Sequence, residues 1–187
     1  SFLRSQSLRP MSAPLTPREP PKLLSLVFPI YNEEEGLPAL RAAVEAWSRS
    51  VPYPCEIILV DDGSRDDSFA LIKSWADADP RVRGLSFSKN FGQQIAMTAG
   101  LSAATGDAIV LLDADLQDPL EVIPQMIERF QQGYDVVYGQ RPEREGETLF
   151  KRVTSWLFYR IMQRFVHPDL PPDTGDFRLV SRRCLDA

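Results

Sequence analysis

Residues 23–32 read LLSLVFPIYN, an apolar run that ends in polar residues, and this pattern decides the fold. Four later segments repeat it: EIILVDD at 56–62, VRGLSFSKN at 82–90, AIVLLDAD at 108–115 and DVVYGQR at 135–141. Amphipathic stretches of helical length separate the five runs. Because this alternation is typical of βαβ units, the sequence predicts an α/β fold with a mainly parallel sheet flanked by helices.

Composition limits the class of protein. The 187 residues are 43% hydrophobic and 25% charged, which is enough to bury one core and predicts a single globular, soluble domain over residues 23–187. The apolar runs are far shorter than the roughly 20 residues that a membrane-spanning helix needs. The two cysteines lack metal-ligand spacing, which indicates a reducing compartment.

Charge and amino-acid composition differ along the chain. The net charge is −5, and the acids are concentrated in the body of the chain, which disfavours a nucleic-acid partner because phosphate contacts require clustered lysine and arginine. Residues 1–22 mix serine, proline and arginine without apolar periodicity. We therefore expect residues 1–22 to be a flexible tail.

Each predicted strand ends in a polar cluster, which indicates a composite binding site. In open α/β sheets, ligands bind outside the carboxyl ends of the strands. There is no GxGxxG or GxxxxGK[ST] motif, so the dinucleotide-binding and P-loop classes are excluded. The pair Asp113 and Asp115 follows a wholly apolar strand. In an extended segment both carboxylates face the same side, as does Gln117, so we predict that these residues hold Mg²⁺ or Mn²⁺.

Five ordered motifs strengthen this interpretation: PIYNEEEGLP at 29–38, ILVDDGSRDDS at 58–68, FSKNFGQQIAMTAGL at 87–101, LLDADLQDP at 111–119 and GDFRLVSR at 175–182. Together they resemble family 2 glycosyltransferases of the GT-A fold, which is Rossmann-like. The resemblance covers residues 23–183. It is strongest to the polyprenyl-phosphate glycosyltransferases, which include bactoprenol glucosyltransferases and dolichyl-phosphate mannose synthases.

The resemblance implies roles for individual residues. The nucleotide-sugar would contact Pro29, Tyr31, Glu33, Val60, Asp62, Lys89, Asp113, Ala114 and Arg141, with Asp62 recognising the base. The metal ligands would be Asp113, Asp115 and Gln117. Asp115, Asp176 and Arg141 would be catalytic, and the acceptor phosphate would meet Arg141, Lys151, Arg152 and Ser155.

The implied reaction transfers a hexose, expected to be glucose from UDP-glucose, to undecaprenyl phosphate with inversion at the anomeric carbon. A phosphate monoester is largely dianionic at pH 7 and already nucleophilic. We therefore hypothesise that Asp176 orients Arg178 or the acceptor as much as it accepts a proton.

The resemblance also implies a location. Residues 149–166 combine arginines with an apolar, aromatic-rich face, a pattern that suits either a membrane-interface helix or a core-packed helix. Relatives continue with transmembrane helices after the GDFRLVSR motif, so we expect a C-terminally truncated catalytic domain. The full-length protein would act at the cytoplasmic face of the bacterial plasma membrane, and the resemblance implies that its membrane anchor can hold protomers together as a homo-oligomer.

Three alternatives stay open from the sequence. A GDP-mannose-dependent mannosyltransferase would share most motifs. A polysaccharide synthase would add a downstream QxxRW signature, which does not occur in this sequence. A non-catalytic nucleotide-sugar binding module would keep the fold and lose the metal pair, but both Asp113 and Asp115 are present.

Overall fold

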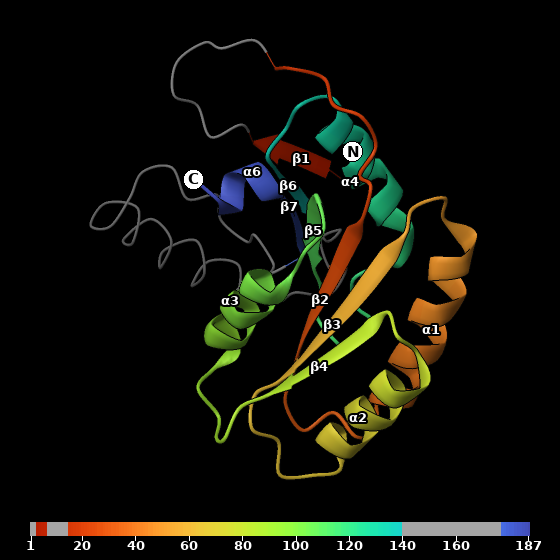
Figure 1. Cartoon of the computed structure of the whole chain (residues 1–187), viewed down its shortest axis with the longest axis vertical. Helices are drawn as coiled ribbons and strands as arrows, with labels where there is room; N and C mark the ends of the chain where they lie inside the picture. Colours follow the sequence, from red (N-terminus) through yellow and green to blue (C-terminus); the bar gives the residue numbers. More distant parts are fainter. Residues whose placement is uncertain (1–2, 7–14, 140–176) are drawn as a thin grey trace, which may run out of the picture.

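The computed structural model describes residues 3–6, 15–139 and 177–187. Its strands form one sheet in the order β1-β6-β7-β5-β2-β3-β4 (Figure 1). The strands are β1 (Leu3–Gln6), β2 (Leu24–Ile30), β3 (Cys55–Asp61), β4 (Val82–Ser86), β5 (Ala108–Leu111), β6 (Val136–Gly139) and β7 (Arg178–Ser181). The helices are α1 (Leu37–Ser50), α2 (Ser68–Ala78), α3 (Gln93–Ala103), the 3₁₀ helix η1 (Leu120–Val122), α4 (Ile123–Gln131) and α6 (Arg182–Leu185).

The sheet is mainly parallel, which confirms the predicted fold class. Strands β5, β2, β3 and β4 pair in parallel, whereas β7 runs antiparallel to both β5 and β6. The five strands expected from the apolar runs all form close to their predicted positions. The parallel strands direct their carboxyl ends, and the polar residues that follow, toward one edge of the sheet.

Helices cover both faces of the sheet, and strand alternation decides which residue meets which helix. Leu26 and Phe28 of β2 pack in the larger core, which also holds buried side chains of α1, α2 and α4. Val27, between them, packs in the second core together with Ala96 and Met97 of α3. Figure 1 shows α3 on the opposite side of the sheet from α1 and α2. Both faces are therefore buried, as the continuous apolar runs predict.

The N-terminal segment departs from the expectation of a flexible tail over residues 1–22. Strand β1 pairs antiparallel with β6, and the Arg18 guanidinium donates to Asp135 at 2.7 Å and lies 5.0 Å above the Phe130 ring. A single arginine and a short edge strand produce no periodic apolar pattern. These contacts were therefore not predicted from the sequence. Residues 3–6 and Arg18, within the segment predicted to be a tail, therefore contact the domain.

No helix within the described ranges is long and apolar enough to cross a bilayer. The predicted interface helix at 149–166 lies outside the described residues.

Candidate functional site

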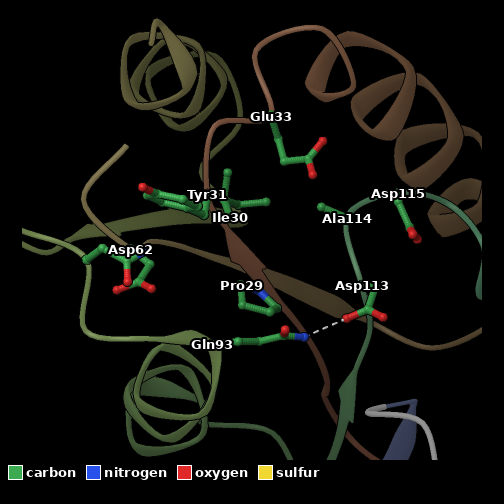
Figure 2. A pocket seen from close by; sticks show the side chains of 10 residues that line it. Pro29, Ile30, Tyr31, Glu33, Asp62, Gln93, Asp113, Ala114 and Asp115 are labelled. Carbon is green, nitrogen blue, oxygen red and sulfur yellow. Dashed lines mark hydrogen bonds between the residues drawn. The ribbon is translucent and has the colours of Figure 1, made fainter. Parts of the chain in front are cut away.

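A cavity of about 340 Å³ opens at the carboxyl ends of β2, β3 and β5 (Figure 2). Its lining consists of Pro29, Ile30, Tyr31, Glu33, Asp62, Asn90, Gln93, Asp113, Ala114 and Asp115. Seven of these residues were predicted for the nucleotide-sugar or metal site. Segments far apart in the sequence therefore meet at the expected edge of the sheet.

The chain after β2 is held by the segment after β3. The backbone N–H of Asn32 donates to Ser64 Oγ at 2.9 Å, and its Oδ1 accepts from the N–H of Arg65 at 2.9 Å. Asn32 has a φ of +53°, a left-handed conformation that asparagine tolerates better than most residues. The N–H of Glu33 donates to Ser68 Oγ at 2.8 Å. These bonds position Tyr31 and Glu33 on the cavity wall.

The adjacent carboxylates Asp61 and Asp62 have different roles, although each is only 2% exposed. Asp61 accepts from the N–H of Ser64 at 3.0 Å and from Ser86 Oγ at 2.8 Å, so it holds the turn against β4. Asp62 lines the cavity. It accepts from the N–H groups of Phe91 at 2.7 Å and Gly92 at 2.9 Å, and so anchors the loop that leads into α3.

Gly63 makes this arrangement possible. Its φ is +69°, and a Cβ atom at this position would lie 2.3 Å from the carbonyl carbon of Lys89. Contacts that short do not occur between real atoms, and a side chain is strained at this φ. The glycine therefore lets the backbone after β4 lie directly on the turn that carries Asp62.

The predicted extended geometry of the aspartate pair is wrong. Strand β5 ends at Leu111. The segment Asp113–Gln117 then contains a turn, in which Leu116 has a φ of +58°. Asp113 Oδ1 accepts from Gln93 Nε2 at 3.0 Å, whereas Asp115 Oδ1 accepts from the N–H of Gln117 at 3.0 Å. Both aspartates still line the cavity, but Gln117 does not belong to its lining.

The cavity is electronegative. Four carboxylates line it, from Glu33, Asp62, Asp113 and Asp115, and none of the described residues in the lining is basic. Burial raises the pKa of Glu33, and the negative charges of Asp115 and then Asp66 raise it further. A cation bound among these carboxylates would relieve the repulsion on Glu33.

The donor set fits a hard divalent cation that is completed by substrate. Carboxylate oxygens are preferred by Mg²⁺ and Mn²⁺, and Mg²⁺ often binds through one or two carboxylates plus substrate phosphates. Among the described residues, no group of three or more histidine, cysteine or acidic side chains is close enough to hold a metal ion. The carboxylates of Asp113 and Asp115 fit such a cation together with a substrate diphosphate.

Two predicted residues lie away from the cavity. Val60 is fully buried and packs in the core beneath α3, so its side chain does not line the base site as expected. The reason is that alternation along β3 directs Val60 onto the sheet face that α3 covers. Lys89 is outside the lining, and its Nζ lies 5.1 Å above the Phe91 ring.

Other predicted residues lie outside the described ranges, namely Arg141, Lys151, Arg152, Ser155 and Asp176. Three lining residues were not predicted: Ile30, Asn90 and Gln93. Asn90 and Gln93 flank the turn into α3 within a quoted motif. Both residues follow the third predicted strand, and the rule that polar residues gather after each strand could have identified them.

Comparison with known proteins identifies sequences that are similar to this chain. Residues 25–187 match Glycosyl transferase family 2. The chain is 45% identical over 162 residues to the uncharacterized glycosyltransferase YkcC of Bacillus subtilis, covering 87% of this chain and 50% of the relative. It is 42% identical over 163 residues to the bactoprenol glucosyl transferase of Shigella phage SfX, covering 87% of this chain and 53% of the relative. The chain thus spans about half the length of these relatives.

A solved structure shares the architecture. Glucosyl-3-phosphoglycerate synthase from Mycobacterium tuberculosis, in complex with Mn²⁺, uridine diphosphate and phosphoglyceric acid, superposes with a TM-score of 0.59 at 23% identity. The match covers 87% of this chain and 56% of that chain. At this identity the similarity establishes the fold alone, which is the GT-A fold.

Proposed function

The chain belongs to glycosyl transferase family 2, and from this premise we propose that it is the donor-binding part of an inverting hexosyltransferase that acts on a polyprenyl phosphate. The observation that carries the proposal is the 42% identity, over 163 residues, to a bactoprenol glucosyl transferase. The acidic cavity at the carboxyl edge of the sheet supports it, because the cavity lies where open α/β sheets bind nucleotides.

The nucleotide would bind between the ends of β2 and β3. Pro29, Tyr31 and Glu33 would contact the base and ribose, and Asp62 would recognise the base. Both Asp62 oxygens already accept backbone N–H groups. Because an ionised carboxylate offers about four lone-pair sites, a base N–H can still be accepted.

The diphosphate would lie beside the turn that follows β5. Asp113 and Asp115 would hold Mg²⁺ or Mn²⁺, and the cation would supply charge neutralisation for the nucleoside diphosphate leaving group. Ala114, between the two aspartates, also lines the cavity. The walls of the cavity would hold the sugar's anomeric carbon in line with the acceptor oxygen.

The acceptor half of the proposal rests on residues outside the described ranges. Arg141, Lys151, Arg152 and Ser155 would bind the acceptor phosphate, and Asp176 would orient it. A lipid phosphate acceptor would place the protein at the cytoplasmic face of the plasma membrane. We also propose that the protein forms a homo-oligomer at this membrane.

Calorimetric titration of UDP, GDP and UDP-glucose into this chain, with and without Mn²⁺, tests the donor half. We expect UDP and UDP-glucose to bind only weakly without Mn²⁺ and at least about tenfold more tightly with it, since the cation offsets diphosphate repulsion from the carboxylates. A preference for GDP would instead favour the mannosyl donor. Absence of binding by all three would contradict the proposal.

Transfer of labelled glucose from UDP-glucose to undecaprenyl phosphate tests the acceptor half. This assay needs the protein at the length of its relatives, because the chain covers only about half of them. Product whose anomeric configuration is opposite to that of the donor is expected. Retained configuration would contradict the single-displacement mechanism.

A further inference from the structure

The first turn of α3 lies between the two sides of the cavity. Strand β2 lies between β3 and β5 in the sheet, and Asp62 follows β3 while Asp113 follows β5. Asp62 accepts the backbone N–H groups of Phe91 and Gly92. Gln93, the first residue of α3, donates from Nε2 to Asp113 Oδ1 at 3.0 Å (Figure 2). The start of α3 is therefore bonded to both aspartates across the end of β2.

The protein core determines where α3 begins. Ala96 and Met97 are buried, and a Cβ atom on Gly100 would lie 2.3 Å from Val27 Cγ1, so the helix lies directly on β2. Gly92 has a φ of +99°, which lets the loop turn into the helix. Since both the helix and the loop are held, the Gln93 side chain reaches Asp113 from a defined position.

An amide is suited to orienting a carboxylate that must attract a cation. A hydrogen bond to an ionised carboxylate is stronger than a neutral one and restricts its rotation. A lysine or arginine at the same position would also cancel the negative charge. Gln93 orients Asp113 and leaves its charge intact, in a cavity with no basic residue among its described lining.

We propose that Gln93 is a positioning residue for Asp113 and thereby sets the metal-dependent affinity for the nucleoside diphosphate. The role rests on the proposed function, because it assumes that Asp113 contributes to cation and diphosphate binding. Groups that orient metal ligands usually affect metal affinity strongly. Gln93 is exposed, so its contact with Asp113 contributes little to folding stability.

The test compares Gln93→Met with the matched control Gln94→Met in this chain. Methionine keeps the length of glutamine without its hydrogen bond, and Gln94 is an exposed neighbour on α3 that does not line the cavity. UDP and GDP are titrated at a series of Mn²⁺ concentrations. We expect about fivefold to tenfold weaker binding of the preferred diphosphate to Gln93→Met, which corresponds to loss of one charge-assisted hydrogen bond in a solvent-exposed setting.

The dependence on Mn²⁺ separates positioning from structure. In Gln93→Met the Mn²⁺ concentration for half-maximal binding should rise, while Tm and metal-free binding stay at wild-type values. Gln94→Met should match wild type throughout. Wild-type affinity in Gln93→Met, or an equal loss in Gln94→Met, would overturn the positioning role and leave the proposed function standing. If the wild-type chain binds neither UDP nor GDP with Mn²⁺, both the proposed function and this role are overturned.

Discussion

Two glutamates at opposite edges of the sheet, Glu56 and Glu33, have opposite environments. At the amino edge, Glu56 Oε1 accepts from Ser25 Oγ at 2.6 Å and from the N–H groups of Thr105 at 2.6 Å and Gly106 at 3.2 Å. Burial would raise the pKa of Glu56, but the hydrogen bonds from Ser25, Thr105 and Gly106 together lower it. At the carboxyl edge, burial and neighbouring acids raise the pKa of Glu33.

This difference separates structural acids from candidate functional ones. Glu56 is satisfied by donors from the strand and loop that it connects, so its charge stabilises the fold. The acids around the cavity are close to one another, with no basic side chain among the described residues of the lining. Such a concentration of acidic side chains is suited to a cationic or metal-bound ligand.

Removing the amino-edge acid should have the largest effect. Glu56→Ala leaves the Ser25 hydroxyl and both the N–H and the hydroxyl of Thr105 without their acceptor, whereas the Gly106 N–H still donates to Ser25 Oγ at 2.9 Å. We expect a loss of about 3 kcal/mol in the free energy of unfolding. Urea denaturation measures it. The exposed control Glu128→Ala should change stability by less than about 0.5 kcal/mol. Equal effects of the two variants would contradict the structural role of Glu56.

Removing a carboxyl-edge acid should impair binding and spare the fold. Asp115→Asn eliminates a charge that faces the cavity, and we expect metal-dependent UDP binding to weaken by at least about a hundredfold, since even changes beside metal ligands cost about tenfold to a hundredfold. Thermal unfolding should show an unchanged or slightly raised Tm. Wild-type affinity with Mn²⁺ would remove Asp115 from the metal site.

A third acid tests whether balanced charges stabilise the attachment of the N-terminal segment. Burial would raise the pKa of Asp135, but hydrogen bonds from Arg183, Ser181 and Arg18 bring it from 3.8 to about 2. Because this pKa is depressed in the folded state, the stabilisation is present above pH 3.8 and is lost as pH falls through about 2. Asp135→Asn should therefore reduce stability by about 1 kcal/mol at pH 7.

Urea denaturation of wild type and Asp135→Asn at pH 7 and at pH 3 checks this sign. The difference in the free energy of unfolding between wild type and Asp135→Asn should be smaller at pH 3 than at pH 7. Arg183→Gln, which removes two hydrogen bonds to Asp135, from Nη2 at 2.6 Å and from Nε at 3.2 Å, should show a smaller loss at pH 7 because Arg18 and Ser181 still donate to Asp135. The same difference in unfolding free energy at pH 7 and at pH 3 would contradict an ionic contribution from Asp135.

The smallest expected effect lies at the cavity and has the opposite sign. The raised pKa of Glu33 means that its ionised form is disfavoured in the folded state. Glu33→Gln should therefore stabilise the protein at pH 7 by a few tenths of a kcal/mol, after allowance for solvent screening. The gain should disappear as pH falls and wild-type Glu33 becomes protonated. Thermal unfolding at pH 7 and pH 4 measures both, and destabilisation at pH 7 would contradict the repulsion.

Much of the fold could be predicted because the strand signal is local. The runs at 24–30, 55–61 and 108–111 are mostly apolar and almost entirely buried, as burial on both faces of a parallel sheet requires. Strand β7 and strand β1 were harder to predict. They are short, they run antiparallel to their neighbours, and their pairing partners are distant in sequence.

Much of the cavity lining was predictable for a similar reason, since chain direction places the residues after parallel strands at one edge. The details of contact were not. Extended geometry was assumed for Asp113–Gln117, but a left-handed residue at Leu116 turns the chain. Val60 was expected at the base site, yet its side chain packs beneath α3.

By itself, the sequence determined the order of β2 to β6 and of the helices between them, the edge at which polar residues gather and the family to which the chain belongs. Only the tertiary structure decided which donors surround each acid. Charge balance depends on donors that folding brings from distant segments, as Thr105 is brought to Glu56 and Gln93 to Asp113. Such pairings leave no periodic pattern in the sequence, because they depend on distances across the sheet rather than on spacing along the chain.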